Sequence, residues 1–193
     1  MALENWRVEI TTRREVTAFI EQWHYSKSIN GCIADFCYKL VNPEGEMCGA
    51  MFFGRLAMAN QYKRFVTNEA DVIELRRLCC IDDTPKNAES FFIARAIKLL
   101  KKQWLGKLII SYADKEHAHS GVIYRASNFT MIGEIKGAKV ILFEGKQYHD
   151  KAIRTKYKGE LKPFAQKLVA ALSTGTAHYK QTAGKYTYTY KIR

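Results

Sequence analysis

The feature that most constrains the fold is an apolar run at residues 107–113, which stops at Asp114. A run of this length without alternating polar positions is typical of a strand covered on both faces. The residues after it predict a helix, because apolar side chains recur at the core-facing positions Val122, Ala126 and Phe129. A second face of that helix would carry polar and small residues, namely His117, Gly121, Tyr124 and Asn128.

This strand–helix stretch is a candidate functional site. Open α/β folds place ligands at the carboxyl ends of buried strands, which is where Asp114 stands. Each residue taken alone also fits an ordinary strand, loop and helix with Asp114 as the helix N-cap. The functional interpretation therefore rests on the concentration of polar side chains over the whole stretch.

The rest of the chain alternates between strand and helix patterns. Predicted strands cover residues 6–10, 34–41, 46–54, 72–81, 107–113, 139–143 and 185–191. One predicted helix begins at Thr11 or Thr12 and has Glu15 in its first turn. Two more are predicted over residues 88–102 and 163–172. Residues 55–70 are expected to form a long connection, Gly133 and Gly137 to flank a turn, and a polar loop to precede the last strand. This order predicts an α/β (α+β) fold with a central mixed sheet flanked by helices.

We expect a single domain over residues 1–193, with a basic insertion at 146–180 before a Tyr-rich last strand. The tyrosines of that strand, Tyr186, Tyr188 and Tyr190, fit sheet packing better than a platform for bases. Five cysteines without a Cys-x-x-Cys pair favour a reducing, cytoplasmic setting. The start of the chain lacks the apolar core of a signal peptide, and no apolar run is long enough to span a membrane.

Charge points to a polyanionic partner. Lys and Arg number 31 against 19 Asp and Glu, so the net charge is +12. Such an excess favours nucleic acid or an anionic membrane. Because 11 Tyr and 3 Trp offer stacking surfaces for bases, nucleic acid is favoured over membrane.

Two groups of residues leave alternatives open. Glu74 and Arg76 lie inside an otherwise apolar strand, so they are either a structural ion pair or functional. His117 and His119 would diverge on a helix and could share a metal only in a loop. Asp114 or His24 would then complete a two-histidine, one-carboxylate iron site.

Several catalytic signatures are absent from the sequence. It has no P-loop, no dinucleotide-binding glycine triplet and no Gly-x-Ser-x-Gly elbow. A zinc deaminase would need His-x-Glu and Pro-Cys-x-x-Cys, which are also missing.

A set of short motifs follows one another along the chain, namely His24–Ser26, Glu74–Arg77, Glu89–Ser90, Ser111–Asp114, Gly121–Phe129 and the last strand from Lys185. In this order they resemble the Mom DNA-modification proteins of Mu-like phages, which are similar to the GNAT enzymes. The predicted order of elements also follows that of the GNAT fold. The resemblance implies an enzyme that converts adenine in phage DNA to N6-carbamoylmethyladenine, which shields the DNA from host restriction.

The resemblance also assigns catalytic weight to Asp114 and Tyr124, with Tyr25, His24, Arg76, Arg77 and Ser90 around them. Our hypothesis is that Asp114 accepts a hydrogen bond from adenine N6–H and orients or deprotonates the amine, while Tyr124 donates or relays a proton at the carbonyl or leaving group of the donor. Tyr25 or His24 would contact the extruded base, and Arg76 would stabilise negative charge. Residues expected around these, or at the donor, are Ser90, Arg77, Lys86, Asn87 and Asn128.

The partner implied is DNA in the host cytoplasm. Residues expected to hold its phosphates are Lys63, Arg64, Lys151, Arg154, Lys156 and Lys158. The donor of the group is unknown, and acetyl-CoA or a related compound is left open. A bound iron ion and a homodimer are also left open. The segment Asp83–Ser90 lacks the glycines with which GNAT enzymes bind pyrophosphate. Two alternatives are an acetyltransferase acting on a small amine or a protein lysine, and a non-catalytic DNA-binding protein.

Overall fold

The computed structural model describes residues 3–117 and 119–192. The chain forms two compact units. The first contains the residues up to Ala113, Gly121–Gly133, and those from Tyr186 on. The second contains Asp114–Ser120 and Glu134–Lys185, which includes most of the predicted basic insertion. The single domain expected over 1–193 stays a prediction.

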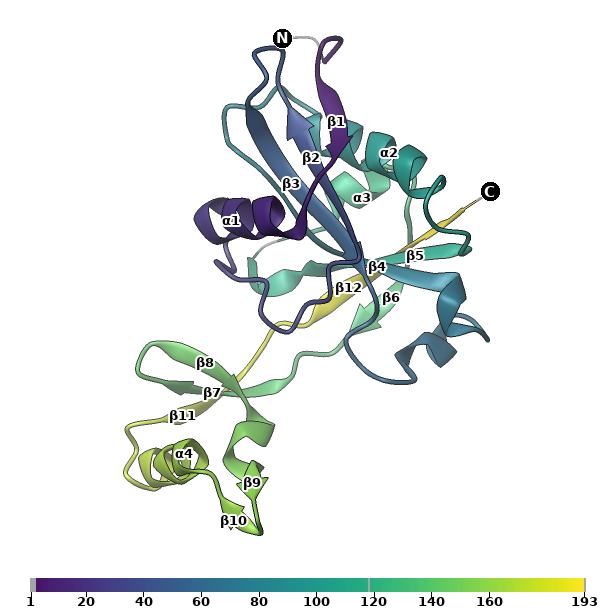
Figure 1. The fold of residues 1–193 in the computed structure, drawn as a ribbon. Coiled ribbons are helices and arrows are strands. Elements are labelled where there is room, and N and C mark those ends of the chain that lie inside the picture. Colours follow the sequence, from purple (N-terminus) through teal and green to yellow (C-terminus); the bar gives the residue numbers. More distant parts are fainter. Residues whose placement is uncertain (1–2, 118, 193) are drawn as a thin grey trace. The chain divides into compact units, whose positions relative to one another are not determined.

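A seven-stranded sheet is the frame of the first unit (Figure 1). Its order is β1 (Arg7–Ile10), β2 (Phe36–Val41), β3 (Met47–Gly54), β4 (Val72–Cys80), β5 (Leu108–Asp114), β12 (Lys185–Lys191) and β6 (Thr130–Ile135). Strands β1 to β4 pair antiparallel, and β4 pairs parallel with β5. This mixed sheet confirms the predicted fold class.

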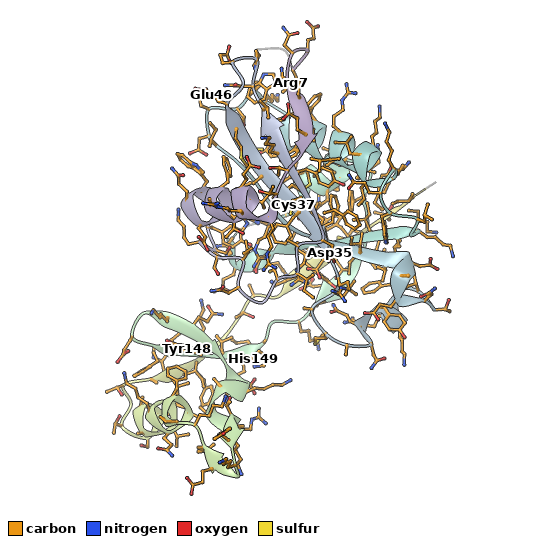
Figure 2. The ribbon with its side chains drawn as sticks, viewed as in Figure 1. Arg7, Asp35, Cys37, Glu46, Tyr148 and His149 are labelled. Carbon is orange, nitrogen blue, oxygen red and sulfur yellow. The ribbon has the colours of Figure 1, made fainter. Side chains whose placement is uncertain are left out.

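Helices cover both faces of the sheet (Figure 1). Helix α1 (Arg13–Trp23) packs on one face, over a cluster that includes Phe19, Ile20 and Cys37, the last labelled in Figure 2. Helices α2 (Ala88–Leu100) and α3 (Val122–Ala126) pack on the other face, over the larger core. In that core Tyr188 is fully buried, as expected of a sheet-packing tyrosine.

Local signals explain where α1 begins and where β2 turns into β3. Thr12 accepts a hydrogen bond from the backbone N–H of Glu15, and the Glu15 carboxylate reaches back to the Thr12 backbone, which forms a capping box. Residues 42–45 close the hairpin, since the backbone N–H of Gly45 donates to the carbonyl of Asn42 at 3.1 Å. Both predictions are confirmed.

Strands β4 and β5 diverge at the point where the charged residues of β4 begin. Their pairing runs from Val72 opposite Leu108 to Leu75 opposite Ser111. On the other side of β4, Phe53 lies opposite Leu75 and Phe52 opposite Arg77, so Arg76 is the extra residue of a β-bulge. A bulge re-aims a side chain and bends its strand, which here happens beside the end of the β4–β5 pairing.

The helix predicted after Asp114 is wrong in its extent. A 3₁₀ turn covers Lys115–His117, and α3 begins only at Val122 and has five residues. Gly121 has φ +73° and Asn128 has φ +62°, so left-handed residues stand on both sides of α3. As a result, His117, Gly121, Tyr124 and Asn128 do not share one helix face.

The second unit contains a three-stranded sheet and a helix. Its sheet order is β11 (His178–Gln181), β7 (Lys139–Phe143), β8 (Lys146–His149), followed along the chain from β8 by a 3₁₀ turn at Asp150–Arg154. The short strands β9 (Lys156–Tyr157) and β10 (Glu160–Leu161) form a hairpin before α4 (Pro163–Ser173). Ile141, Phe143 and Leu168 form its core, and Tyr148, labelled in Figure 2, packs on Phe164 of α4 with ring centroids 5.0 Å apart.

Two further predictions fail in the region of β6 and β11. Thr130–Ile135 is a strand rather than the approach to a turn, and His178–Gln181 is a strand rather than a polar loop. Both strands are exposed along nearly their whole length, so neither shows the alternation that marks a half-buried strand. The remaining short elements are 3₁₀ turns at Gln61–Arg64 and Glu69–Asp71.

Among residues 3–117 and 119–192, no helix is both long and apolar enough to cross a membrane.

Candidate active site

Tyr124 is held in place by aromatic packing in the first unit. Its ring lies 5.2 Å from that of Tyr188 and 5.6 Å from that of Phe129. Arg125 donates a hydrogen bond to the Tyr188 hydroxyl at 2.9 Å. A Cβ atom on Gly121 would lie 2.3 Å from the Tyr188 ring, so only glycine fits there. The left-handed glycine thus lets α3 begin against Tyr188, which orients Tyr124.

The Tyr124 hydroxyl points to the end of the β4–β5 pairing. It is hydrogen-bonded to the side chain of Ser111, whose own hydroxyl donates to the carbonyl of Leu75 at 3.0 Å. Burial raises the pKa of Tyr124 to about 12, and the Ser111 hydrogen bond opposes that rise. The phenol therefore keeps its proton at neutral pH and is available as a proton donor.

Glu74 and Arg76 form a buried ion pair on β4. Their side chains are 11% and 8% exposed, and Arg76 Nη1 lies 3.2 Å from Glu74 Oε2. Arg76 also donates to the carbonyl of Arg55 at 3.0 Å. The structural ion pair left open by the sequence is therefore present. The charge on Glu74 adds to the raised pKa of Tyr124, so Glu74 lies near the phenol.

Glu74 is not among the residues to which we assigned a catalytic role from the sequence. Its position as a carboxylate inside an apolar strand was the feature that indicated a possible function. The Nε atoms of Arg76 and Arg77 are buried and have no hydrogen-bond partner in the described part of the chain. Arg77 donates through Nη1 to the Arg76 carbonyl at 2.8 Å. Orphaned buried donors are uncommon in proteins, and here two stand side by side at the bulge.

His24 and Tyr25 follow the last turn of α1. His24 is 5% exposed, and its Nδ1 accepts a hydrogen bond from the Ser26 backbone N–H at 3.0 Å. An accepting Nδ1 places the proton of a neutral imidazole on Nε2. The Tyr25 ring stacks 4.1 Å from the His24 ring and is 48% exposed. Tyr25 also adds to the raised pKa of Tyr124, so the two tyrosines are neighbours.

Asp114 belongs to the second unit and is already paired. Its Oδ2 lies 3.0 Å from Lys185 Nζ, and its Oδ1 accepts a hydrogen bond from the Glu116 backbone N–H at 3.0 Å. Burial alone would raise the pKa of Asp114, but the hydrogen bond and charge of Lys185 outweigh it and lower the pKa below its usual range. The carboxylate is therefore ionised at neutral pH and is a weak base.

The metal site left open by the sequence is not assembled in residues 3–117 and 119–192. No group of three or more His, Cys, Asp or Glu side chains there could hold a metal ion. The rings of His117 and His119 lie 6.1 Å apart. Burial, and then the charge of His117, lower the pKa of His119.

The residues expected at the donor are not all at one place. Lys86, Asn87 and Ser90 lie at the amino end of α2, where Asn87 is left-handed (φ +68°) and makes no side-chain capping bond. Asn128 instead lines a cavity of about 680 Å³ that also includes Lys101, just past the carboxyl end of α2. A 13-residue helix is about 20 Å long, so Asn128 is remote from the amino end.

The basic residues expected to bind DNA occur in both units. Lys63 and Arg64 are exposed on the 3₁₀ turn Gln61–Arg64, which Gln61 anchors by donating to the Tyr112 hydroxyl at 3.0 Å. In the second unit Arg154 forms an ion pair with Asp150 at 2.7 Å. The exposed lysines of that group have no such partner among the described residues: Lys151, Lys156 and Lys158.

Comparison with solved structures identifies the fold. A phosphinothricin acetyltransferase of the GNAT superfamily from Sinorhizobium meliloti, in complex with AcCoA, matches with a TM-score of 0.56 at 8% identity, covering 97% of this chain and 89% of that one. The ribosomal-protein-S5-alanine acetyltransferase from Vibrio fischeri matches with a TM-score of 0.55 at 9% identity, covering 99% and 95%. At such low identity the likeness shows the fold alone.

Sequence comparison identifies the family. The methylcarbamoylase mom of Escherichia phage Mu is 29% identical over 148 residues, which are 75% of this chain and 60% of the Mu protein. The match thus spans about 60% of the length of this relative. The model of the Mom protein family matches residues 5–193. The chain therefore has the fold of the GNAT acetyltransferases and belongs to the Mom protein family.

Proposed function

We propose that this protein is a transferase that attaches a carbamoylmethyl group to N6 of adenine in phage DNA and so protects that DNA from host restriction. The observation that carries the proposal is the Tyr124 phenol, partly buried beside Ser111 and kept neutral near the Glu74–Arg76 pair. Support comes from membership of the Mom family and from the name of the phage Mu relative, a methylcarbamoylase.

The chemistry asks for a proton donor and for a positioned base. The N6 lone pair is delocalised into the purine ring, so the amine attacks only a well-placed electrophile. A bond forms between N6 and the donor carbon, the bond from that carbon to its leaving group breaks, and N6 loses a proton. Tyr124 donates its proton to the departing group, which its raised pKa allows at neutral pH.

Asp114 is proposed to orient the amine and to accept the N6 proton once the new N6–carbon bond has made that proton acidic. Its lowered pKa makes it a weak base, whereas an ionised carboxylate is a strong acceptor for N6–H. Because adenine N6 is paired in a duplex, the base must be extruded or unpaired, and the exposed Tyr25 ring offers it a stacking surface. Because the Arg76 guanidinium is buried against Glu74, which neutralises its charge, we assign Arg76 the positioning of Glu74 rather than direct stabilisation of negative charge.

At the amino end of α2, uncapped backbone N–H groups favour binding of the diphosphate of a coenzyme A thioester, whereas the charge of Glu89 opposes it. Left-handed Asn87 supplies the turn for which glycine is usual, and it leaves the first-turn N–H groups without a side-chain cap. Glu89 in that turn places a negative charge against an anion. Ser90 and Lys86 would lie nearest to the diphosphate. When bound, a thioester would supply an electrophilic carbonyl carbon and would give an N6-acyl group, whereas a carbamoylmethyl group is joined to N6 through its methylene carbon, so a thioester donor fits the acetyltransferase alternative.

A second candidate is an acetyltransferase acting on another amine, which the likeness to acetyl-CoA-bound GNAT structures favours. Tight binding of acetyl-CoA by the purified protein, together with unmodified DNA in expressing cells, would support it over the DNA-modifying function.

Nucleoside mass spectrometry of DNA from expressing cells tests the proposal. We expect a deoxyadenosine derivative with the mass of the carbamoylmethyl adduct in cells that express the wild type. Asp114→Asn should remove the product and keep DNA affinity, whereas Glu44→Gln, which also neutralises one carboxylate, in the exposed turn between β2 and β3, should keep both. Only ordinary deoxyadenosine in the wild-type sample would falsify the proposal.

A further inference from the structure

The basic side chains of the second unit fall into two classes, paired and unpaired. Nearly every carboxylate of the unit is matched with one cation, in the pairs Asp114–Lys185, Glu116–Lys180, Glu134–Lys115, Glu144–Lys167 and Asp150–Arg154. Seven lysines have no carboxylate partner among the described residues: Lys136, Lys139, Lys146, Lys151, Lys156, Lys158 and Lys162. The positive charge available to a polyanion therefore lies on this set and not on Arg154.

Three of these lysines surround the β9–β10 hairpin. Its strands pair Tyr157 with Glu160 and Lys156 with Leu161. Lys158 and Gly159 at the turn have φ +49° and +87°, as in the type I′ turns that close two-residue hairpins. The second position has the usual glycine, but the first has Lys158 where asparagine or glycine is preferred. The turn between β7 and β8 has the same backbone, with Glu144 at φ +49° before Gly145 at +69°, so what distinguishes the β9–β10 hairpin is the cation at its tip.

The hairpin is fixed to the rest of the second unit. The backbone N–H of Lys162 donates to the carbonyl of Thr155 at 2.9 Å, closing the base of the hairpin. Gln166 of α4 donates through Nε2 to the Leu161 carbonyl at 3.0 Å. The tip is thus presented on a supported element, which lowers the entropy cost of binding.

Tyr157 is the exposed aromatic residue of the hairpin. It is 67% exposed, and its only ring contact in the described part of the chain is the Lys158 ammonium, 5.6 Å from the ring centre. Lys156 precedes it in the chain, so Tyr157 is flanked in sequence by two lysines that have no carboxylate partner among the described residues. Aromatic rings among phosphate-binding lysines are what proteins use to stack on unpaired bases.

We propose that the β9–β10 hairpin is a nucleic-acid contact of the second unit, with Lys156 and Lys158 on DNA phosphates and Tyr157 stacked on a base that lacks its partner. The inference rests on the proposed function for the identity of the partner and adds the element that engages it. It also explains why the unit neutralises some of its cations and leaves the hairpin lysines free.

Fluorescence anisotropy with the full-length protein tests the hairpin at several salt concentrations. The two probes are a fully paired duplex and the same duplex with one unpaired adenine. Wild type should prefer the unpaired probe. Tyr157→Ala should weaken binding to that probe by about 5- to 150-fold, since stacking on one base contributes roughly 1–3 kcal/mol. Tyr157→Phe should keep the preference.

Lysine variants of equal charge separate contact from general electrostatics. Lys158→Gln should lower the slope of log affinity against log salt by about 1, equally for both probes. Lys167→Gln removes the same charge from a lysine that is paired with Glu144 and should leave the slope nearly unchanged. Equal effects of Lys158→Gln and Lys167→Gln, or an unchanged preference in Tyr157→Ala, would overturn the inference.

The two proposals fail in different ways. If wild-type cells contain the modified nucleoside and the hairpin variants bind DNA like wild type, the hairpin inference is wrong and the proposed function stands. If no modified nucleoside is found but the hairpin variants lose affinity, the contact stands and the chemistry is wrong.

Discussion

Two carboxylate–cation pairs of this protein differ in burial. The buried pair stabilises the fold, whereas the more exposed pair is accessible from solvent. The Glu74–Arg76 pair of the first unit has side chains only 11% and 8% exposed. The Asp114–Lys185 pair of the second unit has side chains 20% and 50% exposed. A buried pair is costly to break because the remaining charge has no solvent, whereas an exposed lysine can leave its partner at little cost. Of the two carboxylates, Asp114 is the one whose cation can leave at the lower cost, which agrees with the role proposed for it.

The largest expected effect comes from breaking the buried pair. Arg76→Met leaves the Glu74 carboxylate buried without its partner, and we expect a loss of about 3–5 kcal/mol in the free energy of unfolding. Urea denaturation followed by circular dichroism measures it. The double variant Glu74→Gln with Arg76→Met should recover most of the loss, because no charge is then stranded. A single variant within 1 kcal/mol of wild type would contradict the role given to this pair.

An intermediate effect is expected at Gly121. Gly121→Ala meets both a left-handed backbone and the Tyr188 ring, and should destabilise the protein by roughly 1–3 kcal/mol. Gly175→Ala is the matched control, since Gly175 has φ +77° with no atom within 4 Å of the added Cβ. A larger loss at Gly121 than at Gly175 isolates the contact with Tyr188. Equal losses would mean that the ring contact does not fix α3.

The smallest effect concerns the exposed pair and pH. The folded-state pKa of Asp114 lies below its usual value of 3.8, so the stability it contributes is present above that value and is lost as pH falls through the lower folded pKa. The free energy of unfolding of wild type minus that of Asp114→Asn should be constant, at about 1 kcal/mol or less, near pH 7 and should shrink below about pH 4. Parallel urea titrations between pH 3 and 7 measure it. A difference that grows on acidification would reverse the assignment.

Much of the fold could be predicted because its signals are local. The capping box of Thr12 and Glu15, the turn at residues 42–45 and the apolar strand β5 each depend on a few neighbouring residues. The strands β6 and β11 could not be predicted, because exposure along their length removes the alternating pattern. The helix predicted after Asp114 is too long because the left-handed Gly121 interrupts it. That glycine is required by its close contact with the Tyr188 ring, which lies far away in the sequence.

The candidate site shows the same division. The resemblance singles out Tyr124 and Arg76, among others, and the structure places Tyr124 beside Ser111 and Arg76 against Glu74 in the first unit. Glu74 stands out in the sequence as a charge inside an apolar strand, but its proximity to Tyr124 could not be predicted, because it depends on how β4, β5 and α3 pack. Arg154 differs from the neighbouring lysines because it forms an ion pair with Asp150. The number of charged residues in a sequence does not show which of them are already paired.

The most direct test of the account is a comparison of wild type with Tyr124→Phe by nucleoside mass spectrometry of DNA from expressing cells. The variant keeps the ring that packs on Tyr188 and loses only the hydroxyl bonded to Ser111. We predict modified deoxyadenosine with wild type and at least a hundredfold less with the variant, on the scale of a lost general acid. Equal amounts from the two proteins, with both folded, would contradict the claim that this phenol carries the reaction.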